Sequence, residues 1–490
     1  FFKQKTAYEI MPSLVGSEMC IRDREDMGTL TVLTLIVSLT QLASDFGLSQ
    51  ALAKYVAELK GREEDFSAYI ISSLIFKTFS AILLCLVLFL LSGNISSILL
   101  KSSSLYELVR LAAIDAFILS FQPMFSSLLL GTGQLKRMAA CDVVSNAARW
   151  TAMVALVVLG HGIPGVIMGW ILGDSCSIIL YTAASLRLIR FRGDLLSKST
   201  NLIPSLLRFS WPLLAASLVS FLYAWYDQAL VIAFLPLESV GIYNVSSRAF
   251  GVLSGIATAL GQSLFPYYGM TYGRRDHGAI SAAIKRASRY TMIIIFPLTL
   301  GLFSTAKPAI TLFAGQRYES GWSILAIMSI FGLSFGISAA LTGLLVIYEK
   351  TKIVMLLSIV SIVSSLLLLP TLGMLGLNGL AVMRGASMLL TLLLNVYFIS
   401  KIVKVEIDKE TLIKTLISAG IMATVVFFAQ QLYYSKFLLP FYVIIGVAIY
   451  LAEIRAFKVL NESDFHLLAQ VLGERIAALI AKFMGYNLKI

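Results

Sequence analysis

Charged and metal-binding side chains are scarce in this sequence, and their scarcity argues against most kinds of enzyme. Only 13% of the 490 residues are charged, and the chain has three histidines and four cysteines. The histidines lie far apart, and no two cysteines have the spacing of a metal or redox site. We therefore predict no metal site and interpret Cys85, Cys141 and Cys176 as small buried side chains.

Catalytic motifs are missing as well. The chain has no Gly-x-x-x-x-Gly-Lys-Ser/Thr loop to hold nucleotide phosphates, no nucleophile elbow and no His-Glu-x-x-His pair. Because this phosphate-binding loop is missing, we do not expect the chain to bind and hydrolyse ATP by itself. We predict that the protein is not an enzyme and has no bound cofactor.

Long apolar runs dominate what is present. The sequence is 58% hydrophobic, and its mean hydropathy is +0.85. A run of about 20 apolar residues crosses a hydrocarbon layer as a helix, and these runs lack the alternation of barrel strands. We predict an all-α polytopic membrane protein with thirteen spans. They lie at roughly 28–50, 66–92, 106–130, 138–160, 164–187, 207–235, 240–266, 290–314, 321–347, 353–375, 379–400, 412–434 and 437–455.

The sequence also repeats itself. Residues 25–32 match residues 238–245, and the turn at 162–165 matches the turn at 376–379. The repeat predicts two pseudo-symmetric lobes of six helices, inserted in the same orientation, followed by two additional helices. In the second copy the apolar helix 207–235 precedes the match. The first copy has no counterpart, so the repeat predicts that the first of fourteen helices is missing.

Residues 1–24 hold the place where that helix is expected. Residues 3–10 resemble the translation of a sequencing flow-cell adapter, and residues 14–23 resemble the transposase adapter that follows it. We interpret residues 1–24 as an adapter-derived artefact and leave them out of the fold prediction.

Positive charge predicts the topology. Lysines and arginines gather in alternate loops, for example at Arg286 and Arg289, and such loops stay cytoplasmic. The net charge of +12 therefore reflects topology rather than nucleic-acid binding. We predict a protein of the cell membrane with a cytoplasmic C-terminus. Its predicted parts are a truncated N-lobe (25–187), a basic cytoplasmic linker (188–206), a C-lobe (207–400), two additional spans (401–455) and an amphipathic cytoplasmic tail (456–490).

Several charged side chains fall inside the predicted spans. An ion at mid-bilayer costs about 2.5–3.5 kcal/mol, so each should face the bundle interior or water. Lys77 and Arg149 lie deepest, and a cationic cavity suits an anionic group such as diphosphate. Pairing between helices is the alternative, for instance Arg149 with Asp115 or Asp174, and would stabilise packing only.

Two groups of candidate site residues follow. The candidates for substrate binding are Lys77, Arg149, Arg248 and Arg384. The candidates for ion coupling or pairing are Asp115, Asp174 and Asp227. Asp227 and Arg384 lie near the outer ends of their spans, where an interfacial position is the alternative.

Short motifs across residues 25–460 point to a known family. They are Ala-Ser-Asp-Phe-Gly-Leu at 43–48, Gly-Thr-Gly-Gln at 131–134, Gly-His-Gly-Ile-Pro-Gly-Val at 160–166, Trp-Tyr-Asp at 225–227, Val-Gly-Ile-Tyr at 240–243 and Phe-Ala-Gly-Gln-Arg-Tyr at 313–318. With these motifs the chain resembles the polysaccharide flippases (Wzx-type polysaccharide biosynthesis proteins) of the multidrug/oligosaccharidyl-lipid/polysaccharide exporter superfamily, abbreviated MOP.

The resemblance implies a flippase that moves polyprenyl-diphosphate-linked oligosaccharide from the inner to the outer leaflet by alternating access. It also implies a cationic lumen and an ion gradient of H+ or Na+. The implied partners are the lipid-linked oligosaccharide, membrane lipid, and polysaccharide polymerase or glycosyltransferase machinery, with no nucleic acid. Two alternatives stay open. One is a cation-coupled, MATE-like multidrug antiporter of the same superfamily, for which an acidic cavity is expected; the other is a lipid II-type flippase, which differs only in cargo.

Overall fold

The computed structural model describes most of the chain. The described residues are 24–186, 188, 195–273, 277–348, 350–405, 408–461, 464, 481–482 and 486. Within these ranges the secondary structure is helical and no strand occurs, so the predicted all-α fold is confirmed. The predicted adapter segment apart from Arg24, part of the basic linker and most of the amphipathic tail lie outside the described residues.

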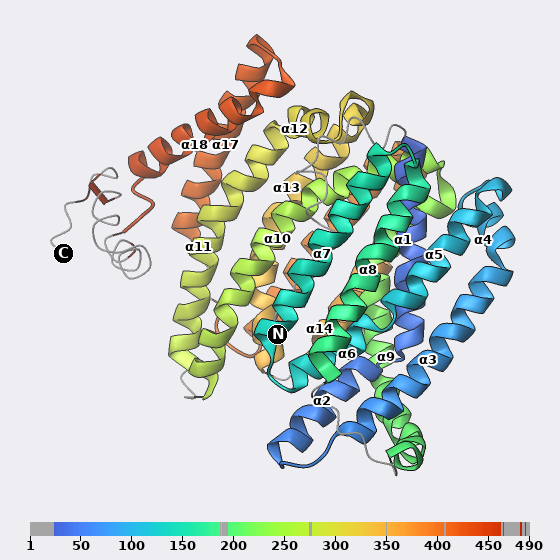
Figure 1. The fold of residues 1–490 in the computed structure, drawn as a ribbon. Coiled ribbons are helices and arrows are strands. Elements are labelled where there is room, and N and C mark those ends of the chain that lie inside the picture. Colours follow the sequence, from blue (N-terminus) through green and yellow to red (C-terminus); the bar gives the residue numbers. More distant parts are fainter. Residues whose placement is uncertain are drawn as a thin grey trace. The chain divides into compact units, whose positions relative to one another are not determined.

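Of the described residues, those from 24 to 244 form one compact unit, called the N-terminal unit. Its helices are α1 (Arg24–Asp45), α2 (Leu48–Gly61), α3 (Ser67–Leu90), α4 (Ser92–Leu99), η3 (Ser103–Leu105), α5 (Tyr106–Leu119), α6 (Gln122–Gly131), α7 (Leu135–Val158), α8 (Gly162–Leu186) and α9 (Leu195–Phe234). Helix α5 packs against α1, α3 and α8, and α8 packs against α7 (Figure 1). Helix α5 is thus central to this unit.

Residues from 245 onward form the second compact unit, called the C-terminal unit. Helix α10 (Leu237–Gly273) crosses from one unit to the other. The remaining helices are α11 (His277–Ser304), α12 (Ala306–Phe313), η4 (Gln316–Gly321), α13 (Trp322–Ile347), α14 (Thr351–Leu367), α15 (Pro370–Leu375), α16 (Leu377–Ser400), α17 (Lys409–Leu432), η5 (Lys436–Leu438) and α18 (Leu439–Ala456). Helix α11 packs against α13 and α17, and α17 packs against α18 (Figure 1). A buried apolar cluster around Met292, Phe296 and Leu345 joins them.

Apolar length identifies the membrane-spanning helices. In the described part of the chain, eleven helices are long and apolar enough to cross a membrane, and residues 352–367 form a shorter apolar helix. The protein is therefore a multi-pass helical membrane protein. The predicted count of thirteen spans stays a prediction.

The repeat assigns most of α9 to the predicted C-lobe, but α9 packs with the helices of the N-terminal unit. Helix α9 contacts α3, α2 and α1, so it belongs to the N-terminal unit. Compact packing accordingly divides the chain inside α10, between residues 244 and 245. The predicted lobes rest on sequence symmetry, which is a different property, and their boundaries stay predictions.

A sharp turn separates α1 from α2 and fixes the end of α1. Phe46 and Gly47 both adopt left-handed backbone conformations, with φ of 49° and 75°. A Cβ atom on residue 47 would lie 2.7 Å from the carbonyl oxygen of Ser210 in α9, so only glycine fits this close approach. The turn leaves Asp45 as the last residue of α1, where its side chain accepts hydrogen bonds from Ser49.

Glycines bring α7 and α8 into close contact. Gly165, Gly169 and Gly173 follow one another at four-residue spacing on α8, which places them on one helix face. A Cβ atom on residue 169 would lie 2.6 Å from the Cα of Met153, and one on residue 173 would lie 2.2 Å from the Cβ of Arg149. Small residues at such spacing let two membrane helices approach closely. This stripe sets Arg149 directly against α8.

Candidate functional site

Three buried charged residues meet where α8 packs against both α5 and α7. The Arg149 Nη1 donates hydrogen bonds to both carboxyl oxygens of Asp174, at 2.9 and 3.1 Å. Both residues are 5% exposed, and the guanidinium lies over the Trp170 ring, 5.4 Å from its centroid. The structure thus shows Arg149 paired with Asp174, as in the alternative that the sequence analysis left open. The predicted role of Arg149 in substrate binding stays a prediction.

Asp115 is the third member, and neither of its carboxyl oxygens has a hydrogen-bond donor. The residue is completely buried. It interacts electrostatically with Asp174 and Arg149, and it lies within hydrogen-bonding reach of Asp174. Two ionised carboxylates accept but do not donate, so that bond forms only when one of them carries a proton. We call Asp115, Arg149 and Asp174 the buried triad.

Lys77 forms a separate buried ion pair in the N-terminal unit. Its Nζ lies 2.7 Å from the Oδ1 of Asp45; the lysine side chain is 1% exposed and the aspartate side chain 17% exposed. Serine hydroxyls next to this ion pair form further hydrogen bonds. Ser80 donates to the Ser44 carbonyl at 2.9 Å, and Ser44 donates to the Ser120 hydroxyl at 3.0 Å. The sequence motif at 43–48 contained Asp45, but the sequence alone did not single it out as the partner of Lys77.

Asp227, Arg248 and Arg384 are the remaining predicted site residues. Asp227 is buried on α9 and accepts a hydrogen bond from the Tyr243 hydroxyl at 2.7 Å. Arg248 on α10 and Arg384 on α16 belong to the C-terminal unit, and both are partly buried. Their predicted contact with substrate stays a prediction. Among the described residues, no group of three His, Cys, Asp or Glu side chains is arranged to hold a metal ion.

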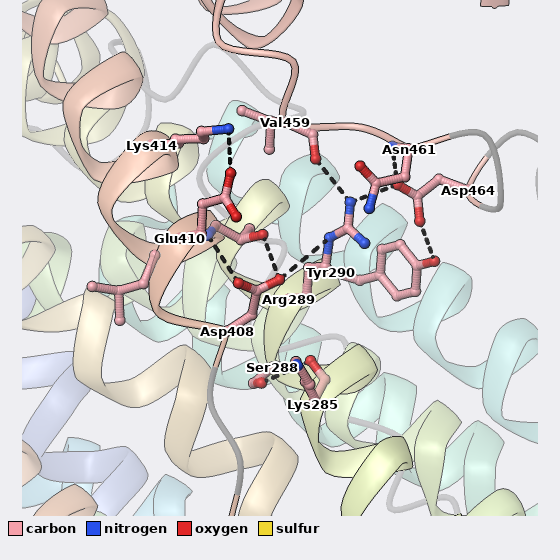
Figure 2. Close-up of polar contacts among 12 residues, drawn as sticks. Lys285, Ser288, Arg289, Tyr290, Asp408, Glu410, Lys414, Val459, Asn461 and Asp464 are labelled. Atoms are coloured by element: carbon pink, nitrogen blue, oxygen red, sulfur yellow. Dashed lines mark hydrogen bonds and ion pairs between the residues drawn. The ribbon is translucent and has the colours of Figure 1, made fainter.

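A second arginine cluster lies in the C-terminal unit, and no sequence pattern had indicated it. Arg289 on α11 donates to Asp464 at 2.7 Å and to the Val459 carbonyl at 2.8 Å, and its Nε lies 3.9 Å from Asp408 (Figure 2). Asp464 also accepts from the Tyr290 hydroxyl at 2.7 Å. Arg289 thus joins α11, the start of α17 and the chain that follows α18. From the sequence it was only one of several inner-loop charges.

Asp408 caps the start of α17. Its side chain accepts from the Thr411 backbone N–H at 3.1 Å and from the Thr411 hydroxyl at 2.8 Å. Burial raises the pKa of Asp408, but these hydrogen bonds and the charges of Arg289 and Lys285 outweigh it, and the pKa is lowered from 3.8. The carboxylate is therefore stabilised in its ionised form.

The fold and its buried charges define a class: a polytopic helical membrane protein with buried ion pairs between its helices. The profile of the family described as polysaccharide biosynthesis proteins matches residues 23–323. The chain belongs to this family, and the resemblance seen in the sequence motifs is confirmed.

Two curated relatives extend the match. The chain is 20% identical over 471 residues to the "Probable low-salt glycan biosynthesis flippase Agl15" of Haloferax volcanii, which covers 90% of each protein. It is also 20% identical over 307 residues to the "Succinoglycan biosynthesis transport protein ExoT" of Rhizobium meliloti. That second alignment covers 62% of this chain and 59% of the relative, so it spans less than two thirds of the rhizobial protein.

Solved structures confirm the fold at lower sequence identity. The inward closed conformation of the lipid II flippase MurJ aligns with a TM-score of 0.72 at 14% identity, covering 89% of this chain and 95% of that one. An inward-facing multidrug resistance MATE transporter of the MOP superfamily aligns with a TM-score of 0.59 at 14% identity, covering 80% and 97%. The chain shares its architecture with these two kinds of transporter.

Proposed function

We propose that the protein is a flippase that moves polyprenyl-diphosphate-linked oligosaccharide across the cytoplasmic membrane by alternating access. One observation carries the proposal: the chain belongs to the polysaccharide biosynthesis protein family and aligns over 90% of its length with a protein named as a glycan biosynthesis flippase. The MurJ-like fold is consistent with a lipid-linked cargo, because it is a fold in which a lipid flippase is built.

The proposed setting follows from the same reasoning. The protein is a transporter rather than an enzyme, its C-terminus lies in the cytoplasm, and it works beside the polymerase or glycosyltransferases that handle the same glycan. The asymmetry of positive charge between alternate loops supports this orientation.

Lys77 is the residue that we assign to the diphosphate. It is held by a single carboxylate, Asp45, whose side chain reaches the surface of the N-terminal unit. A diphosphate offers a lysine the same charge-assisted bond that Asp45 offers now, so the lipid headgroup can replace Asp45 as the partner during transport. Arg149, Arg248 and Arg384 remain candidates for the same anion, Arg149 at the cost of its bonds to Asp174.

The test is genetic complementation of a strain that lacks its own polysaccharide flippase. The wild-type gene should restore glycan export, and Lys77→Ala and Arg149→Ala at equal membrane expression should reduce it. Lys414→Ala is the matched control, because Lys414 forms an exposed pair with Glu410 and should leave export unchanged.

Three outcomes would count against parts of the proposal. Normal export by both Lys77→Ala and Arg149→Ala would refute the cationic cargo site. Drug resistance conferred by the wild type without any glycan phenotype would establish the multidrug antiporter instead. Rescue of a strain that lacks its lipid II flippase, with no rescue of polysaccharide export, would change the cargo to lipid II.

A further inference from the structure

We propose that the chain after α18 is a releasable strap, which Arg289 holds against the start of α11 and which restrains movement of α18. The strap consists of residues 457–461 and Asp464, the described residues that follow α18 most closely. The sequence predicted an amphipathic tail for this segment, with no contact to α11.

The end of α18 turns the chain back toward the other helices. Lys458 adopts a left-handed backbone conformation, with φ of 49°, which residues other than glycine rarely adopt. The Lys458 N–H donates to the Arg455 carbonyl at 3.2 Å, and the Val459 N–H donates to the Ile454 carbonyl at 3.1 Å. Such bonds satisfy the last carbonyl groups of a helix where the chain reverses. Val459 is then buried in the apolar cluster around Met292.

Polar contacts with α11 hold the strap in this position. Arg289 donates to the Val459 carbonyl at 2.8 Å and to the Asp464 carboxylate at 2.7 Å (Figure 2). The Tyr290 hydroxyl donates to Asp464 at 2.7 Å, and the Asn461 N–H donates to the same carboxylate at 2.7 Å. Two consecutive residues of α11 therefore bind a carboxylate that the strap itself helps to position.

An ion pair in this place is better suited to selecting an arrangement than to stabilising it. The Arg289 side chain is 12% exposed and the Asp464 side chain 4% exposed. Removing two such charges from water costs free energy that their attraction only partly returns, so a buried ion pair contributes little to net stability. The best-attested use of buried polar pairs is to specify register or to act in a switch. The pair between Arg289 and Asp464 therefore selects the closed position of the strap.

The two ends of the α17–α18 pair are held differently. Near the end of α17, Gln430 donates to the Ser304 carbonyl of α11 at 2.9 Å. Gln430 belongs to a helix that packs along α11, so breaking this bond requires the helices to separate. Asp464 follows α18 and can leave Arg289 without that separation. Both charged groups then regain water, which lowers the cost of opening, so the strap is the end that opens first.

Opening of the strap would loosen α18. This helix packs mainly against α17, and its Tyr450 hydroxyl donates to the Ile293 carbonyl of α11 at 2.8 Å. With the strap closed, α18 is tied to α11 both there and at Arg289. In the proposed flippase, release at Arg289 would let α18 shift beside α11 during transport. That consequence rests on the proposed function; the strap itself does not.

Hydrogen–deuterium exchange of the full protein in lipid nanodiscs measures opening of the strap. Peptides that cover residues 457–464 should exchange at least about tenfold faster in Arg289→Gln and in Asp464→Asn, because each loses a charge-assisted hydrogen bond. Peptides from α11 and α17 should exchange as in wild type. The double variant should open no further than Arg289→Gln, since both changes remove the same contact.

Two further variants make the result decisive. Tyr290→Phe removes one hydroxyl bond to Asp464 and should give a smaller increase. Lys414→Ala breaks the neighbouring pair with Glu410 and should leave exchange of the strap unchanged. Equal acceleration of the strap, α11 and α17 in Arg289→Gln would overturn the proposal, because the cluster would then stabilise the whole unit. Wild-type exchange of the strap in both Arg289→Gln and Asp464→Asn would overturn it as well.

A transport measurement separates this inference from the proposed function. Vesicles that contain the protein are loaded with a fluorescent polyprenyl-diphosphate oligosaccharide. Arg289→Gln should flip this cargo faster than wild type, because α18 is no longer restrained, and Lys414→Ala should match wild type. An equal or slower rate in Arg289→Gln would refute the restraint on transport. No flipping by wild type would count against the proposed cargo, while the exchange result would still decide the strap.

Discussion

Two arginine clusters in this protein have the same charges but different surroundings. In the N-terminal unit, Arg149 lies with Asp174 and Asp115; in the C-terminal unit, Arg289 lies with Asp464 and Asp408. Each cluster thus combines one guanidinium with two carboxyl groups. They differ in how many other groups donate hydrogen bonds to those carboxyls.

The cluster around Arg289 has donors for both of its carboxylates. Asp464 accepts from Tyr290 and from the Asn461 backbone N–H, and Asp408 accepts from Thr411 (Figure 2). In the buried triad, by contrast, Asp115 has none. Since hydrogen bonds from donors favour the charged form of a carboxyl, the first arrangement stabilises both carboxylates, whereas the second gives Asp115 no such stabilisation. The same three charges are therefore supported by further hydrogen-bond donors in one unit, whereas one carboxyl of the other unit has no donor.

Removing the arginine of each cluster should give the largest difference in stability between the two clusters. Arg149→Leu should lower the free energy of unfolding by about 3–5 kcal/mol, because it leaves buried carboxyls without their counter-charge. Arg289→Leu should cost about 1.5–3 kcal/mol, because the carboxylates there keep other donors. Chemical denaturation of both variants in the same detergent measures the difference. Equal losses would mean that the surroundings of the two clusters are energetically equivalent.

Neutralising one aspartate in each cluster is the next comparison. Asp464→Asn should cost about 1.5–3 kcal/mol, because Arg289 loses a charged partner at 2.7 Å. Asp115→Asn should change stability by less than about 1 kcal/mol at neutral pH, since the carboxyl that it replaces accepts no hydrogen bond from a donor. Denaturation curves for the two variants check this. A larger loss for Asp115→Asn would show that Asp115 is ionised in the native protein.

The close packing of α7 and α8 sets Arg149 directly against α8. Gly173→Ala should cost about 1–3 kcal/mol, because its Cβ would overlap the backbone and Cβ of Arg149. Gly420→Ala on α17 is the matched control. Its Cβ meets nothing within 4 Å, so the higher helix propensity of alanine should stabilise the protein by about 1 kcal/mol. Thermal unfolding midpoints of the two variants should move in opposite directions.

The smallest expected effect concerns the helix cap at Asp408. Asp408→Ala should cost about 1 kcal/mol at neutral pH through loss of the cap on α17. The pKa of Asp408 is lowered in the folded protein, so its stabilisation is present above the ordinary value of 3.8 and is lost as the pH falls through the lowered pKa. Wild type and variant should therefore converge in stability in acid. A difference that is independent of pH would refute the role of the ionised carboxylate.

Much of the fold could be predicted from the sequence. Apolar runs of sufficient length predict helices that cross a membrane whatever their neighbours are, and the motifs around residues 43–48 and 160–166 indicated the family. Residues such as Lys77, Arg149 and Asp115 stood out because a charge within an apolar run is costly unless it faces other protein groups or water. The glycine spacing on α8 is also visible in the sequence, but it was not used to predict the contact with α7.

The partners of those charges could not be predicted. Asp45 and Lys77 belong to different helices, and the pairing depends on the left-handed turn at Phe46 and Gly47 that ends α1 beside α3. Arg289 and Asp464 are brought together by the return of the chain after α18, which no local pattern specifies.

The sequence by itself determined a multi-pass helical membrane protein, its family and the set of charges that must be accounted for, because these depend on composition and on the spacing of residues along one chain. Only the tertiary structure decided which charges neutralise one another and which carboxyl was left without a donor. The reason is physical: the energy of a buried charge depends on groups within a few ångströms, and helix packing, not sequence distance, sets those neighbours.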